Sequence, residues 1–76
     1  MNKVYDPDMI AKRIRFVRTD IAKQNVRDFA EDVQTTPTNV RRWERGEHMP
    51  SAFCIFMICS EYDVSANWLL GLSDRR

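Results

Sequence analysis

Residues 25–45, NVRDFAEDVQTTPTNVRRWER, restrict the fold of this chain more than any other stretch. They predict two short helices joined by a tight turn. In the first helix, the cap Asn25 is followed by apolar residues at the i, i+3, i+4, i+7 spacing of one buried helix face. These apolar residues are Val26, Phe29, Ala30 and Val33. Because Ala30 is small, the two helices are expected to cross closely.

The second of these helices has a defined start and end. Thr36 is a good N-cap, and Pro37 suits the first helical position because its missing N–H would be unpaired there in any case. Asn39 can reach back toward the cap in the manner of a capping box. Gly46 predicts the end of the helix. These signals place the helix at about residues 37–45.

The side chains of this second helix divide between two faces. At about 100° per residue, Val40 and Trp43 fall on one side, which we expect to pack inward. The outward stripe carries one neutral polar group and three guanidinium groups, on Thr38, Arg41, Arg42 and Arg45. Arginine can pair with a guanine edge or hold a phosphate, and a helix fits the DNA major groove. The stripe therefore indicates a DNA-reading helix, with an ordinary solvated face as the alternative.

Charge is distributed unevenly along the chain. The formal net charge is only +1. Residues 12–45, however, hold nine Lys or Arg against five acids, whereas residues 46–74 hold four acids and no Lys or Arg. Basic charge is thus concentrated on the half that carries the proposed reading helix, as a nucleic-acid-binding surface requires.

Several short segments together resemble one known family. They are Phe29-Ala30, Val40, Trp43-Glu44, Gly46-x-x-x-Pro50 and Trp68-Leu69-Leu70-Gly71. Their spacing is similar to that of the Cro and lambda-repressor-like helix-turn-helix proteins, often called the XRE family, over roughly residues 10 to 72. The resemblance implies an all-α, compact five-helix DNA-binding domain in which helices two and three form the helix-turn-helix. Residues 1–76 would be one domain with a core of about 7–72.

The resemblance also implies a tie between helices and shows where this chain departs from the pattern. An ion pair between Arg18 and Glu44 would join helix one to helix three. The usual glycine between helices one and two is absent, and that connection is one residue longer. Val26 stands where the family commonly has a phosphate-binding glutamine. Gln34 replaces the customary glycine between helices two and three, so we expect a left-handed backbone there, at a cost of roughly 1 kcal/mol.

The stripe and the resemblance together assign DNA contacts. Pro37 lies where many relatives bond a base, but it has no donor and at most touches a thymine methyl group. Base reading is therefore assigned mainly to Thr38, Arg41 and Arg42. The predicted phosphate contacts are Asn25, Thr36, Asn39 and Arg45. Arg18 is expected either to form only the ion pair with Glu44 or to contact a phosphate as well.

The segments at the two ends are predicted to be simpler. After a short arm of residues 1–5, Asp6 caps a first helix from about Pro7 to Ala22. Its apolar residues recur at helical spacing, at Ile10, Ile14, Val17 and Ile21. Ser65 caps a short last helix that Gly71 ends. Residues 72–76 are expected to form a frayed tail.

A fourth helix, residues 52–62 after the cap Ser51, is apolar on nearly every side. With Ile55 at its centre, the inward face is predicted to hold Ala52, Ile58, Cys59 and Tyr62. The opposite face holds Phe53, Phe56 and Met57, with Leu70 of the last helix as a candidate addition. A second apolar face on so small a domain predicts a homodimer interface. The alternatives are docking of another protein and cover by the chain ends.

Other chemistry is missing from the sequence. Cys54 and Cys59 point about 140° apart on one helix, and His48 is the single histidine, so neither a disulfide, a metal site nor a cofactor is expected. No glycine-rich phosphate loop or converging set of acids indicates an enzyme or a small-molecule substrate. The apolar run 52–59 is too short to span a membrane and no leader opens the chain, which predicts a cytoplasmic protein of a bacterial or phage-infected cell.

These observations lead to one leading hypothesis and one rival. The leading hypothesis is a phage- or prophage-like transcriptional regulator, repressor-like, that binds a double-stranded DNA operator as a homodimer. The rival is an antitoxin or protein-interaction module whose main partner docks on the outer face of helix four, with DNA binding secondary.

Overall fold

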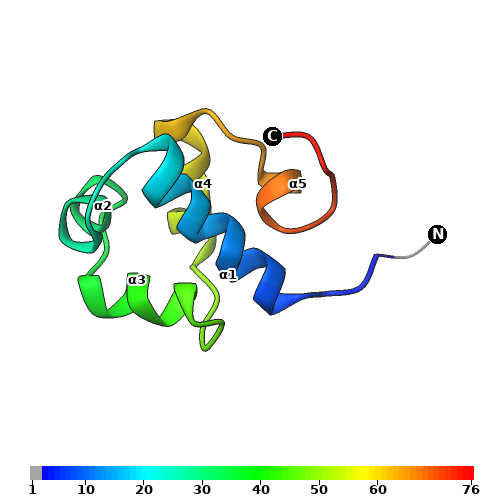
Figure 1. Cartoon of the computed structure of the whole chain (residues 1–76), viewed down its shortest axis with the longest axis horizontal. Coiled ribbons are helices and arrows are strands. Elements are labelled where there is room, and N and C mark those ends of the chain that lie inside the picture. The colour runs from blue at the N-terminus through cyan, green and yellow to red at the C-terminus, as the bar shows by residue number, and fades with distance from the viewer. Residues whose placement is uncertain (1–2) are drawn as a thin grey trace.

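The computed structural model describes residues 3–76, and these residues form helices without any strand (Figure 1). The elements are α1 Pro7–Phe16, the π-helical turn η1 Val17–Ile21, α2 Val26–Asp32, α3 Pro37–Glu44, α4 Ala52–Tyr62 and α5 Ala66–Leu69. The predicted five-helix, all-α architecture is confirmed. Of the predicted arm, residues 1 and 2 lie outside the described part, and residues 3–5 are exposed.

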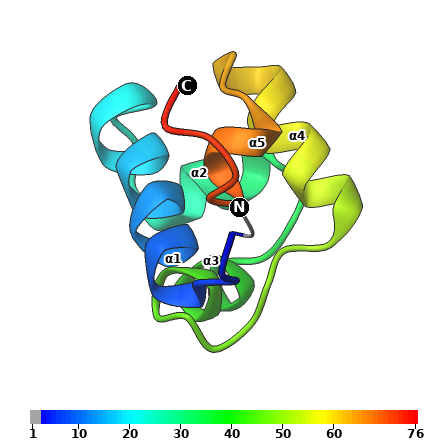
Figure 2. The ribbon, with the colours of Figure 1, turned by 90° about the vertical axis from the view of Figure 1, so that its right-hand side faces the viewer.

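Along the long axis of the molecule, α2 and α3 lie toward one end and α5 toward the other (Figure 1). The view along that axis shows α1 on one side and α4 on the opposite side, with α2 and α5 between them (Figure 2). All five helices contribute to one core. Its fully buried side chains are Ile14, Val17, Phe29, Val33, Val40, Ile58 and Leu69. The apolar periodicity read from the sequence therefore corresponds to one shared core.

Each of the five α-helices begins with a side-chain cap. The caps accept a hydrogen bond from the backbone N–H three residues further on, and they are Asp6, Asn25, Thr36, Ser51 and Ser65. Such a bond satisfies one of the unpaired N–H groups of the first turn. All five caps are the residues predicted from the sequence, so the start of each helix is encoded locally.

The end of the first helix differs from the prediction of a single α-helix to Ala22. At Val17 the helix widens into η1, where the Ala22 N–H donates to the Val17 carbonyl at 2.8 Å. A π-turn holds one more residue than an α-turn does. The connection then turns at Lys23, which adopts a left-handed φ of 55°. Gln34 has a φ of 60°, which confirms the left-handed residue expected there.

The buried face of α4 is rotated from the predicted one. Cys54 and Ile58 are buried, Ile55 and Cys59 are half-buried, and Ala52 is exposed. The prediction for Ala52 was therefore wrong. Because nearly every residue of this helix is apolar, its periodicity carries little information about which side faces the core.

The predicted frayed tail is also wrong. The Leu72 N–H donates to the Asn67 carbonyl at 2.7 Å, and the Ser65 N–H donates to the Arg76 carbonyl at 2.7 Å. Arg13 of α1 donates from Nη1 to the carbonyls of Trp68 and Ser73. A side chain distant in sequence thus satisfies carbonyls at the end of α5 and holds the tail against α1.

Tyr62 joins α4 to α2 and to the loop before it. Its ring stacks on Phe29 with centroids 5.5 Å apart. Its hydroxyl lies 2.9 Å from Gln24 Oε1 and 3.0 Å from Asp32 Oδ2, and Gln24 Nε2 donates to Asp32 Oδ2 at 2.7 Å. Burial, followed by the bond to Asp32, raises the pKa of Tyr62 above its ordinary value of 10.0. The neutral phenol is therefore the form that the fold stabilises.

Tyr62→Phe should lower the free energy of unfolding by about 1 kcal/mol, because the ring stack remains while the hydroxyl hydrogen bonds are lost. Because the pKa is raised on folding, the contribution of the phenol is complete below about pH 10 and is lost as the pH rises further. Urea unfolding of both proteins at pH 8 and pH 10.5 measures this. An equal stability of variant and parent at pH 8 would contradict the role given to the hydroxyl.

Candidate nucleic-acid interface

Helix α3 has one face in the core and one in solvent. The side chain of Val40 is fully buried and that of Trp43 is 4% exposed. Thr38, Arg41 and Arg42 are exposed, as is Arg45, the residue that ends the helix. The side chains predicted to form the outward stripe therefore all lie on the surface. The inner face gives them a rigid base, because Val40 and Trp43 are packed on all sides.

The residues at the start of α3 bond mainly to one another. Thr36 Oγ1 accepts the Asn39 N–H at 3.2 Å, and Asn39 Nδ2 donates to Thr35 Oγ1 at 3.0 Å. Pro37 is half-buried at the first helical position. Asn25 caps α2 in the same way, since its Oδ1 accepts the Asp28 N–H at 2.8 Å. Thr36, Asn39 and Asn25 remain exposed at the two helix starts.

The predicted ion pair between Arg18 and Glu44 is present. Arg18 Nε lies 2.7 Å from Glu44 Oε2 and Nη2 lies 2.9 Å from Oε1, while Nη1 donates to the Gln24 carbonyl at 3.1 Å. The two side chains are only 13% and 10% exposed. The hydrogen bond to Glu44 raises the pKa of Arg18, and partial burial opposes it. The paired geometry fixes the last turn of α3 against η1.

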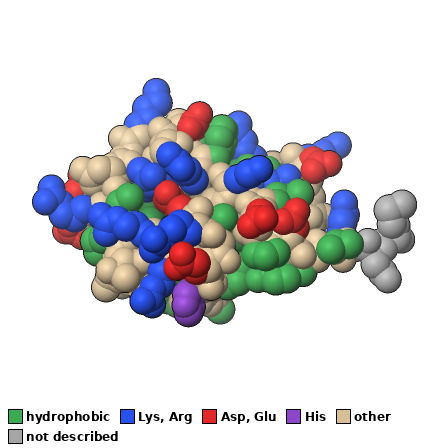
Figure 3. All heavy atoms as spheres, turned by 60° about the horizontal axis from the view of Figure 1, so that its bottom comes forward, with side chains coloured by type: hydrophobic (Ala, Val, Ile, Leu, Met, Phe, Trp, Pro, Cys, Tyr) green, Lys and Arg blue, Asp and Glu red, His purple; other side chains and the backbone are tan. Residues whose placement is uncertain are grey.

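A hollow of about 180 Å³ lies between α1 and the end of α3, lined by Arg15, Arg41, Glu44 and Arg45. Arg15 was not among the predicted site residues. It lies one helical turn before Arg18, so the pair between Arg18 and Glu44 brings Arg15 close to the last turn of α3. Figure 3 shows the face that carries α3, where Lys and Arg side chains gather on the left half.

The apolar residues predicted to form an interface lie in two different places. On α4, the side chains of Phe53 and Phe56 are 52% and 64% exposed, and Met57 is half-buried. Leu70 instead lines a hollow of about 280 Å³ with residues that include Val4 and Tyr5 of the arm. The tail runs along α1 and α5 and leaves Phe53 and Phe56 uncovered, so the chain ends, as far as residue 3, do not cover this face.

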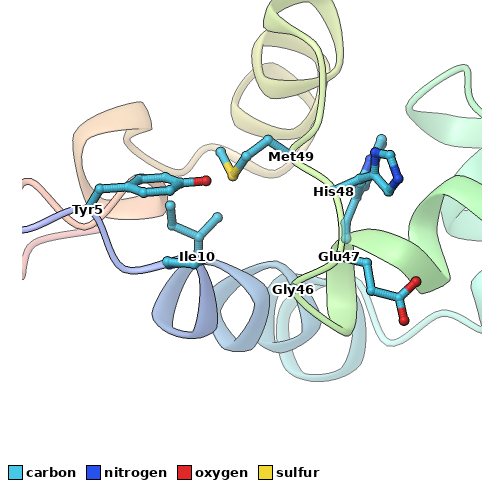
Figure 4. A pocket seen from close by; sticks show the side chains of 8 residues that line it. Tyr5, Ile10, Gly46, Glu47, His48 and Met49 are labelled. Carbon is cyan, nitrogen blue, oxygen red and sulfur yellow. The ribbon is translucent and has the colours of Figure 1, made fainter.

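The loop after α3 packs against the N-terminal arm. A small hollow of about 50 Å³ separates this loop from Tyr5 and Ile10. Figure 4 shows Met49 pointing toward Tyr5 and Ile10, whereas Glu47 and His48 point away. The space is too small for more than a water molecule or two, so we assign no ligand to it. His48 is exposed.

The cysteines are free thiols, Cys54 buried and Cys59 half-buried, and burial raises the pKa of Cys59. Within residues 3–76, His, Cys, Asp and Glu side chains form no group of three that could hold a metal ion. None of the described helices is long and apolar enough to cross a membrane.

Glu44→Ala should lower the free energy of unfolding by about 2 kcal/mol, because the half-buried guanidinium of Arg18 loses its partner. Glu47→Ala is the matched control, since Glu47 pairs with Arg45 at 3.3 Å on the surface, where both side chains are more than half exposed. We expect this control to change stability by less than about 0.5 kcal/mol. Urea denaturation measures both, and equal effects would show that the Arg18–Glu44 pair is no more important than a surface contact.

No protein-family model matches the sequence, and no curated protein matches it. Among solved structures, the P22 c2 repressor protein, in complex with synthetic operator 9T in the presence of Tl⁺, is similar with a TM-score of 0.75 and 22% identity, over 86% of this chain and 97% of that one. The clp gene regulator ClgR from Corynebacterium glutamicum gives a TM-score of 0.73 and 21% identity, over 87% of this chain and 69% of that one. The chain therefore has the Cro and lambda-repressor-like helix-turn-helix fold.

Proposed function

We propose that this chain is a sequence-specific, double-stranded-DNA-binding transcriptional regulator that places α3 in the major groove. The observation that carries this proposal is the exposed stripe of α3, whose opposite face is buried and whose last turn is fixed by the Arg18–Glu44 pair. The similarity to the P22 c2 repressor protein, solved with a synthetic operator, supports it. A repressor-like role of the phage or prophage type, as predicted from the sequence, remains part of the proposal.

Base reading is proposed for the outward side chains of α3. Arg42 is exposed and can form two parallel hydrogen bonds with a guanine edge. Thr38 can donate to or accept from a base, and Pro37 offers an apolar contact to a thymine methyl group. The sequence predicts base reading for Arg41 as well. A rigid helix is needed because paired hydrogen bonds tolerate little error in position.

Phosphate contacts are proposed on both sides of the reading helix. Asn25, Thr36 and Asn39 are exposed at the starts of α2 and α3, where backbone N–H groups favour anions. Arg45 at the end of α3 is exposed as well. Each of the three guanidinium nitrogens of Arg18 already bonds a protein oxygen. For Arg18 we therefore propose only the structural ion pair with Glu44 and no phosphate contact.

Selection of bound sequences from random duplex DNA tests the proposal. We expect a motif bound at least about 1000-fold more tightly than a scrambled control. Arg42→Ala should then cost about 1 to 3 kcal/mol on the selected site and little on random DNA. Affinities measured on both duplexes decide this. Equal losses on the two would make Arg42 a phosphate contact, and the absence of any motif would contradict sequence-specific reading.

We further propose a homodimer that uses the α4 face formed by Phe53, Phe56 and Met57. Two exposed phenylalanines close together on one helix are unusual on the surface of a monomer. A two-fold dimer would present two reading helices to half-sites about 34 Å apart. Because Leu70 lines the hollow beside the arm, it is not included in this face.

Phe56→Glu should convert the dimer to a monomer, because the interface would then bury an unpaired carboxylate. Its affinity for an operator with two half-sites should fall to that for one half-site. Val4→Glu is the control, since Val4 is 86% exposed in the other apolar region. Sedimentation equilibrium gives the mass of each protein, and an unchanged dimer in the Phe56 variant would exclude this face as the interface.

The exposed phenylalanines of α4 also favour a second candidate function. An antitoxin or protein-interaction module would use the same face for another protein, with DNA binding secondary. The two functions differ in the state of the isolated chain. A monomer that binds DNA without a two-fold motif would support the second candidate.

A further inference from the structure

The hollow between α1 and α3 gathers three guanidinium groups from two elements. Arg15 extends from α1, whereas Arg41 and Arg45 lie one turn apart at the end of α3. Glu44 is the only acid in its lining, and both of its carboxylate oxygens already bond to Arg18. The hollow therefore has an excess of positive charge that its own acid does not neutralise.

The three arginines have little other compensation. Within residues 3–76, neither Arg15 nor Arg41 makes an ion pair. Arg45 Nε lies 3.3 Å from Glu47 Oε2, but both side chains are more than half exposed, so that pair is weak. Like charges held together in this way repel one another, and an anion bound between them would remove the repulsion.

We propose that this hollow binds a single phosphate group of the DNA backbone, an inference that rests on the proposed function. Guanidinium groups bind phosphate oxygens through paired, charge-assisted hydrogen bonds. The lining contains no aromatic side chain on which a base could stack, so the site suits a phosphate rather than a nucleobase. The proposal adds Arg15 to the DNA-binding residues and assigns Arg41 to the backbone instead of to a base edge. Base reading by arginine is then left to Arg42.

The position of this phosphate site allows it to set the orientation of α3 on the DNA. One phosphate would touch α1 through Arg15 and α3 through Arg41 and Arg45. The Arg18–Glu44 pair, directly beside the hollow, fixes those two helices relative to each other. A phosphate held by both helices sets the rotation of α3 in the groove, whereas a contact to α3 alone would permit the helix to roll.

The first experiment measures DNA affinity against salt concentration. Arg15→Ala should reduce the slope of log affinity against log salt by about 1 per bound protomer. It should weaken binding about tenfold on the selected site and on random DNA alike. Lys12→Ala is the matched control, because it removes one charge from the same helix but lines a different hollow with Phe16 and Trp68. An Arg15 variant that matches the Lys12 variant in slope and affinity would overturn the proposal.

The second experiment separates Arg41 from Arg42. Lysine can still contact a phosphate as a point charge but loses the paired geometry that reads guanine. Arg41→Lys should therefore keep the ratio of specific to random affinity, whereas Arg42→Lys should lower that ratio at least about tenfold. A drop in the ratio for Arg41→Lys would return Arg41 to base reading and contradict its assignment here.

The third experiment does not depend on DNA binding. Inorganic phosphate is titrated into the protein while the Nε–H signals of the arginines are followed by nuclear magnetic resonance. Saturable shifts at Arg15 and Arg41 that disappear in the Arg15→Ala, Arg41→Ala double variant are expected. If these shifts occur in a protein that binds no DNA, the phosphate site stands and the proposed function fails. If DNA binds specifically without these shifts and without an effect of Arg15→Ala, the function stands and the site fails.

Discussion

The paired contact between Arg18 and Glu44 is the interaction on which the arrangement of this domain depends. A largely buried ion pair adds little net stability, because desolvation offsets much of the attraction. Its value lies in its geometry: two parallel bonds permit one orientation of the guanidinium plane. The third nitrogen bonds the Gln24 carbonyl, so the same side chain also fixes the loop that leads into α2. Arg18 of η1 thereby contacts both α3 and the loop that leads into α2, and it fixes these two parts relative to each other.

The net charge of the chain is close to zero, but the exposed face of α3 carries Arg41, Arg42 and Arg45. Of the acids on the basic half, Glu44 pairs with Arg18 at 10% exposure of its side chain, and Asp32 accepts hydrogen bonds from Gln24 and Tyr62. The charge of Glu44, the acid nearest the exposed arginines of α3, is therefore balanced by Arg18. The field near a surface depends on such local pairing and only weakly on the total charge.

Most features that the sequence could predict have local causes, whereas the distant Arg18–Glu44 pair was predicted only through the resemblance to a known family. A cap such as Thr36 and its helix start are separated by three residues, and the left-handed backbone at Gln34 follows from the tight turn between two helices. The contacts of Arg13 with Ser73 and of Arg15 with the hollow join residues far apart in the chain, so periodicity carries no signal for them. Arg15 could still have been found, since it lies one turn from Arg18, whose predicted pair with Glu44 brings that part of α1 close to the end of α3. The face of α4 was misjudged at Ala52 because a uniformly apolar helix has no contrast to read.

The π-turn η1 changes the winding of the first helix directly beside the Arg18–Glu44 contact. The wide ring of η1 is closed by the Val17 carbonyl and the Ala22 N–H. Arg18 lies inside this ring and still meets Glu44 with both bonds intact. The winding of the helix therefore changes at η1 without loss of the contact that holds the last turn of α3. A wide turn and the guanidinium of a paired ion contact thus coexist in the same five residues.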